Sequence, residues 1–114
     1  MTLDEYQGAI EGFDMFTSRD YDLREAGYFE KILGLVGEAG EVADKYKKII
    51  RDHDGQISPQ QRDDLIKELG DVLWYVATLA RYLDVSLDEV ARRNVTKLSD
   101  RQQRHLIQGE GDNR

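Results

Sequence analysis

The stretch "GLVGEAGEVADKYKK" at residues 34–48 decides the fold, because its apolar residues recur every three to four positions. This spacing places them on one face of an α-helix. The spacing continues on both sides of the stretch and predicts a helix over residues 28–51. Its buried face is expected to consist of Ile32, Leu35, Val36, Ala39, Val42, Ala43, Tyr46, Ile49 and Ile50.

Three further helices are predicted from their first residues. Thr2, Ser58 and Ser86 each precede an acid or amide by three positions, which is the pattern of a capping box at a helix N-terminus. The expected helices cover residues 3–17, a segment that starts at residue 59, and residues 87–104, with polar loops at 18–27 and 52–57. The core stripe of the helix from residue 59 is expected to be Leu65, Leu69, Val72, Leu73, Val76 and Leu83.

Length and composition limit the classes of protein to consider. The chain has 114 residues, a net charge of −7 and no cysteine. We expect an all-α, four-helix-type bundle with one domain over residues 1–108 and a flexible polar tail or lid at 109–114. The acidic charge disfavours nucleic acid as a partner. No apolar run approaches the roughly 20 residues that span a bilayer. We therefore expect no membrane partner, and we expect a cytoplasmic location.

Two acidic pairs flank the apolar faces of the two central helices. Glu38 and Glu41 lie three positions apart, as do Glu68 and Asp71, so the members of each pair are neighbours on a helix surface. If the two pairs face each other, four carboxylates meet in a partly dry site, which is costly unless cations or protons compensate. Oxygen ligands of this kind favour hard cations such as Mg²⁺. The alternative is that these acids are solvated surface residues.

Two other metal sites fit the sequence poorly. An EF-hand loop that starts at Asp52 would need glycine where Ile57 stands. A di-iron bundle would need a glutamate three residues before a histidine, and neither His53 nor His105 has one.

Basic and amide residues on the expected last helix are candidates for phosphate binding. Asn94 lies within its apolar stripe, and Lys97 and Arg101 flank the same face. On the central helix, Lys45 and Lys48 extend the line of the glutamates toward the expected phosphate position. The alternative is that Asn94 bonds to a neighbouring backbone and that the cations lie at the surface.

Three residues of the central helices invite further expectations. Gly37 and Gly40 give room for a close neighbour next to the glutamates, although each weakens the helix by about 1 kcal/mol relative to alanine. Trp74 is expected to lie away from the core stripe and to contact another subunit. The alternative for Trp74 is partial cover by the first helix or a loop.

Three segments resemble the MazG-like, all-α nucleotide pyrophosphohydrolases. They are "LVGEAGEVADKYKK" (35–48), "KELGDVLWYV" (67–76) and "RRNVTKLSDR" (92–101), in the order and spacing of that family. The resemblance covers roughly residues 28–104. One position departs from the family pattern E-E-x-x-E, because Gly37 stands where its first glutamate would be.

The resemblance implies hydrolysis of (deoxy)nucleoside triphosphates to a nucleoside monophosphate and pyrophosphate, with Mg²⁺ or Mn²⁺, in cleaning of the nucleotide pool. It also implies a homodimer or homotetramer with the site near a subunit interface. The metal ligands would be Glu38, Glu41, Glu68 and Asp71. The substrate contacts would be Lys48, Tyr75, Asn94 and Lys97, with Arg101 as a further phosphate-side candidate.

The expected mechanism is direct attack by water, because no serine, cysteine or histidine is placed as an activated nucleophile. Glu41 or Glu38 would accept the proton of that water. Two alternatives stay open: a phosphoribosyl-ATP pyrophosphohydrolase of the same superfamily, and a non-catalytic helical interaction module whose acids only confer solubility.

Overall fold

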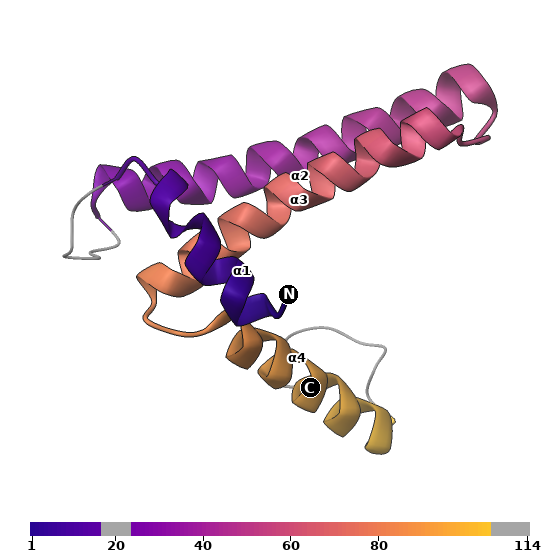
Figure 1. Cartoon of the computed structure of the whole chain (residues 1–114). Coiled ribbons are helices and arrows are strands. Elements are labelled where there is room, and N and C mark those ends of the chain that lie inside the picture. The colour runs from indigo at the N-terminus through magenta and orange to yellow at the C-terminus, as the bar shows by residue number, and fades with distance from the viewer. Residues whose placement is uncertain (17–23, 106–114) are drawn as a thin grey trace.

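The computed structural model describes residues 1–16 and 24–105, and this part of the chain is all-α, as predicted (Figure 1). The predicted boundary at residue 108 and the predicted tail or lid at 109–114 lie outside the described residues. The helices are α1 (Leu3–Ile10), the 3₁₀ helix η1 (Glu11–Phe13), α2 (Ala26–His53), α3 (Pro59–Tyr82) and α4 (Leu87–Gln103).

The long helices α2 and α3 lie side by side as an antiparallel pair (Figure 1). Helix α1 crosses this pair and contacts α3, and α4 extends away from the pair while contacting α1 and α3. None of the described helices combines the length and apolar character that a membrane crossing requires.

Side-chain caps begin three of the four α-helices. Thr2 and Ser58 form complete capping boxes, in which each hydroxyl accepts the N–H three residues later and the partner side chain accepts in return. Ser86 accepts from the N–H of Glu89, and only this half of the predicted box is present. The N-cap residue of α2, Glu25, makes no side-chain capping hydrogen bond, and the C-cap residue, Asp54, adopts the left-handed conformation with φ 53°.

The first helix is shorter than predicted, because the expected span of residues 3–17 ends as an α-helix at Ile10. One 3₁₀ turn follows, and at Asp14 the backbone becomes extended with φ −79° and ψ 117°. Glycines at positions 8 and 12 weaken the helical continuation. The extended backbone then allows the Asp14 side chain to turn into the protein.

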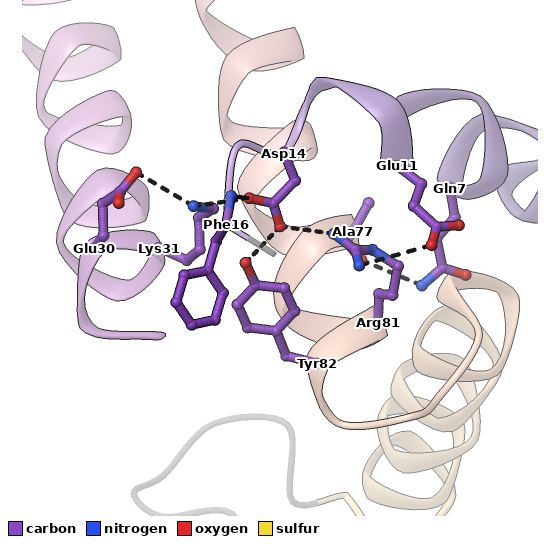
Figure 2. Close-up of polar contacts among 9 residues, drawn as sticks. All are labelled: Gln7, Glu11, Asp14, Phe16, Glu30, Lys31, Ala77, Arg81 and Tyr82. Carbon is purple, nitrogen blue, oxygen red and sulfur yellow. Dashed lines mark hydrogen bonds and ion pairs between the residues drawn. The ribbon is translucent and has the colours of Figure 1, made fainter. Parts of the chain in front are cut away.

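The buried carboxylate of Asp14 ties the end of the α1 segment to α2 and α3 (Figure 2). Its side chain is 2% exposed and accepts from Lys31 Nζ at 3.1 Å, from Arg81 Nη2 at 2.7 Å and from the Tyr82 hydroxyl. The N–H of Phe16 also donates to it, at 2.9 Å. Burial raises the pKa of Asp14, but these hydrogen bonds and the charge of Lys31 outweigh burial and lower the pKa overall.

A second junction is made by the amide of Gln7 on α1. Its Nε2 donates to the carbonyl oxygens of Ala77 at 3.2 Å and Val85 at 3.1 Å, and its Oε1 accepts from the N–H of Leu87 at 3.1 Å. Ala77 and Leu87 also form a buried apolar cluster with Ile10. This one amide therefore fixes α1 against α3 and against the start of α4.

The apolar face predicted for α2 is divided between two sides of the helix. Ile49 is 5% exposed against α3, whereas Val36 is 66% exposed. The expectation of one continuous buried face is wrong for this chain, because α3 covers only one side of α2. The exposed apolar residues of α2 include Phe29, Ile32, Leu33, Val36, Tyr46 and Ile50. Leu69 and Leu83, which were expected in the core stripe of α3, are also exposed.

Candidate metal centre

Three carboxylates from the two long helices converge. One carboxylate oxygen each of Glu38, Glu68 and Asp71 lies within 4.8 Å of the other two. Glu38 comes from α2, and Glu68 and Asp71 stand about one turn apart on α3. Glu38 and Glu68 are half-buried and Asp71 is exposed, so the group is open to solvent on one side. We call these three residues the acidic cluster.

A close approach of α2 and α3 positions the acidic cluster. A Cβ added to Gly34 would lie 2.2 Å from Cε1 of Tyr75, so the aromatic ring occupies the space that a side chain would need. Glu38 follows Gly34 by four residues, about one helical turn, and points to the same side of α2. The helices therefore meet tightly next to the position from which Glu38 faces α3.

The glycines that were expected to make this room lie elsewhere. A Cβ added to Gly37 or Gly40 would have nothing within 4 Å in the described part of the chain. The expectation that they admit a close neighbour is therefore not met within this chain, and Gly34 is the glycine at which α2 and α3 touch.

The charges of the acidic cluster act on one another. Partial burial and the negative charges of Asp71, Glu68 and Glu41 raise the pKa of Glu38. All the converging donors are oxygens, and their mutual repulsion would be relieved by a cation. These properties fit a hard divalent cation such as Mg²⁺.

Glu41 is the fourth predicted ligand, and the structure does not bring it into the acidic cluster. Its side chain is exposed, although its charge contributes to the raised pKa of Glu38. The predicted roles of Glu41 as a ligand and as a proton acceptor remain predictions.

The predicted substrate residues on the long helices lie on both sides of the acidic cluster. Tyr75 packs over Gly34. Lys48 pairs with Asp44 at 2.6 Å and lines a cavity of about 130 Å³ at the far end of the α2–α3 pair. That cavity also contains Lys45, whose Nζ lies 3.3 Å from Oε1 of Glu68.

The predicted substrate residues on α4 lie at a different place in the chain. Asn94 and Lys97 line an open cavity of about 600 Å³ beside the α3–α4 turn, together with Arg93. Asn94 is exposed, so the expectation of an amide on a buried stripe is wrong, because no described helix covers that side of α4. Arg101 is 4% exposed, which excludes the alternative of a surface cation for this residue.

Trp74 is half-buried rather than exposed, as the structure places it against the apolar cluster of Ile10, Ala77 and Leu87. Its ring meets the ring of Tyr75 edge-on, with centroids 4.9 Å apart. The alternative of partial cover by the first helix therefore describes Trp74 within this chain.

Sequence reasoning missed one residue near the acidic cluster. Burial and the charge of Asp71 raise the pKa of Tyr6 on α1. The sequence indicated only that Tyr6 belongs to an apolar helix face. The angle at which α1 crosses α3 determines that this face approaches Asp71, and no local pattern encodes that angle.

Comparison with known proteins identifies the family. The sequence model of the MazG nucleotide pyrophosphohydrolase domain matches residues 30–106, which is more than half of the chain and includes the whole acidic cluster. This protein belongs to the MazG family. MazG domains generally depend on divalent metals, in agreement with the chemistry of the acidic cluster.

Two curated relatives are similar to the chain in sequence. The Gene 37 protein of Mycobacterium phage L5 is 62% identical over 82 residues, which cover 72% of each chain. The uncharacterized protein YvdC of Bacillus subtilis (strain 168) is 35% identical over 82 residues, which cover 68% of this chain and 77% of the relative. No solved structure matches the chain.

Proposed function

We propose that this MazG protein hydrolyses (deoxy)nucleoside triphosphates to nucleoside monophosphates and pyrophosphate, with Mg²⁺ or Mn²⁺ at the acidic cluster. The observation that carries the proposal is the convergence of oxygens from Glu38, Glu68 and Asp71 within 4.8 Å in a chain of this family. A bound divalent cation would supply a Lewis acid that activates water and offsets phosphate charge.

The proposed reaction is a single displacement at the α-phosphorus. The oxygen of water forms a bond to this phosphorus, the bond to the oxygen that bridges the α- and β-phosphates breaks, and pyrophosphate leaves. A carboxylate accepts the proton of the water. Glu38 is one candidate, because its carboxylate belongs to the acidic cluster. Glu41 is the other, because it lies beside the cluster without belonging to it.

The remaining predicted residues are assigned to the nucleotide. Lys48 and Tyr75 lie on the long pair that carries the acidic cluster, and Asn94, Lys97 and Arg101 lie on α4. Within one chain, the residues of α4 lie at a different place from the acidic cluster. We therefore propose that the complete site forms near an interface between two copies.

We propose a homodimer, or a homotetramer built from it, in which a second copy covers the outer apolar face of α2. Leu33 and Val36 on this face are 68% and 66% exposed. The radius of gyration is 17.0 Å, whereas a compact domain of this length has about 13 Å. A chain that is both extended and apolar on one side lacks the second layer that a helix pair needs.

The test is a product-resolved panel of nucleoside triphosphates, standard and modified, with Mg²⁺ and phosphoribosyl-ATP as a separate arm. Hydrolysis in ¹⁸O-labelled water is expected to place the label in the nucleoside monophosphate, with pyrophosphate as the second product. Orthophosphate as the main product, or label in pyrophosphate, would contradict attack at the α-phosphorus. Preference for modified nucleotides would support a role in cleaning the nucleotide pool.

A non-catalytic interaction module makes the opposite prediction. It requires that Mg²⁺ leaves the melting temperature unchanged, because ligands stabilise only proteins that bind them. Turnover of phosphoribosyl-ATP alone would instead favour the related pyrophosphohydrolase.

A further inference from the structure

An ion pair connects Lys45 of α2 to the acidic cluster. Lys45 Nζ lies 3.3 Å from Oε1 of Glu68, and the Glu68 side chain is 18% exposed. Glu68 is also one of the three residues proposed to hold the divalent cation. The ammonium group and the cation therefore compete for the same carboxylate.

The competition favours the divalent cation. The side chain of Lys45 is 37% exposed, and ion pairs at that level of exposure add little to stability, so displacement of the ammonium costs little. A divalent cation carries twice the charge and would be held by oxygens of all three cluster residues, whereas Lys45 pairs with Glu68 alone among them.

A cavity next to Lys45 could accept the displaced ammonium group. Lys45 also lines the cavity of about 130 Å³ that contains Lys48 and His53. Lysine carries its charge on a flexible four-carbon stem, so Nζ can leave Glu68 without any movement of α2.

We propose that Lys45 is a built-in counter-ion of the acidic cluster, which a divalent cation displaces from Glu68 so that the ammonium becomes available to the nucleotide phosphates. The phosphate half of this inference rests on the proposed function, and the displacement half rests on the ion pair. In the ion-free protein Lys45 is paired with Glu68, and binding of the cation releases Lys45 for contact with phosphate.

The test is a calorimetric titration of the full chain with Mn²⁺ alone. Lys45→Met removes the charge and keeps the length of the side chain. It is expected to bind Mn²⁺ about two- to five-fold more tightly, because no ion pair has to be broken. Lys45→Arg keeps the charge and is expected to bind Mn²⁺ as the unchanged protein does. The matched control is Lys47→Met, which removes a lysine that pairs with Asp44 and is 68% exposed.

The outcomes separate this inference from the proposed function. Unchanged or weaker Mn²⁺ binding by Lys45→Met, or equal tightening by Lys47→Met, would overturn the role of Lys45 as a specific counter-ion. Absence of Mn²⁺ binding to the unchanged protein would instead overturn the metal centre, and the inference with it. At saturating Mn²⁺, Lys45→Met is expected to raise KM for the nucleotide several-fold, and an unchanged KM would overturn the phosphate contact.

Discussion

The ring of Tyr75 lies where a side chain on Gly34 would be, with Cε1 at 2.2 Å from the position of the missing Cβ. This contact sets the separation of α2 and α3 about one turn from Glu38. The geometry of the acidic cluster therefore depends on the absence of a methyl group at a position that is not itself a ligand.

Gly34→Ala is expected to destabilise the protein, although alanine is the better helix former by about 1 kcal/mol. The methyl group would overlap the Tyr75 ring, and overpacking of this kind costs about 1–3 kcal/mol. The matched control is Gly37→Ala on the same helix, where a Cβ has nothing within 4 Å. Relative to the unchanged protein, chemical denaturation should show a lower midpoint for Gly34→Ala and a higher midpoint for Gly37→Ala. Midpoints that shift in the same direction in both variants would contradict the role of this contact.

Glu38→Gln is expected to keep or raise the melting temperature of the ion-free protein and to abolish its rise with Mg²⁺. The substitution removes the charge of Glu38, which partial burial and the negative charges of Asp71, Glu68 and Glu41 disfavour, and it also removes a proposed ligand. Asp63→Asn is the control, since Asp63 lies on α3 with a side chain that is 65% exposed. Thermal melts with and without Mg²⁺ measure both effects. A Mg²⁺ shift that persists in Glu38→Gln would exclude this residue as a ligand.

Gly37→Glu is expected to tighten Mn²⁺ binding. The substitution restores the first glutamate of the family pattern E-E-x-x-E, and nothing within 4 Å obstructs a side chain there. Calorimetric titration of this variant beside Gly37→Gln, which has the same shape without the charge, separates charge from bulk. Equal affinities in the two variants would show that a carboxylate at this position does not reach the ion.

Asp14→Asn is expected to lower the free energy of unfolding by about 3–5 kcal/mol near neutral pH, because it removes the buried anion shared by Lys31 and Arg81 and leaves Lys31 paired with the exposed Glu30. The matched control is Asp100→Asn, which removes an exposed pair with Arg104 on α4. Urea denaturation measures the difference. A loss no larger than that of Asp100→Asn would show that the buried network contributes little to stability.

The same network sets the acid dependence of stability. The folded pKa of Asp14 is lowered, so the unfolded chain binds a proton at a higher pH than the folded one does. The stabilisation is complete above the unfolded pKa of about 3.9 and is lost as the pH falls through the lowered folded value. The difference in melting temperature between the unchanged protein and Asp14→Asn should therefore shrink below about pH 4, and a constant difference would contradict the assignment.

Val36→Glu is expected to shift the protein toward monomers and to lower turnover, because it puts a charge into the proposed interface. Gln56→Glu adds the same charge in the exposed α2–α3 turn and serves as the control. Light scattering coupled to size-exclusion chromatography measures the mass. An unchanged mass for Val36→Glu would remove the outer face of α2 from the interface.

Local patterns predicted the helices and part of the candidate site. The period of apolar residues predicted α2 to within a few residues of its observed ends, and the capping residues Thr2 and Ser58 marked the starts of α1 and α3. The three-residue spacings of Glu38 with Glu41 and of Glu68 with Asp71 placed each pair on one helix face and favoured a meeting of four carboxylates. The structure brings Glu38, Glu68 and Asp71 together and leaves Glu41 outside the acidic cluster.

Contacts between distant segments could not be read from local patterns. The first helix ends early because Asp14 finds partners on two other helices, and a hydrophobic period does not reveal such partners. Likewise, periodicity alone identified Val36 as apolar and helical, but it does not distinguish a face that meets α3 from one left open.

The division of α2 into an acidic inner side and an apolar outer side has a thermodynamic consequence. Under the proposed assembly, the apolar side is buried only when two chains meet, so folding and association share one equilibrium. The melting temperature would then rise with protein concentration, and strong dilution would cost activity without any change in the chain itself.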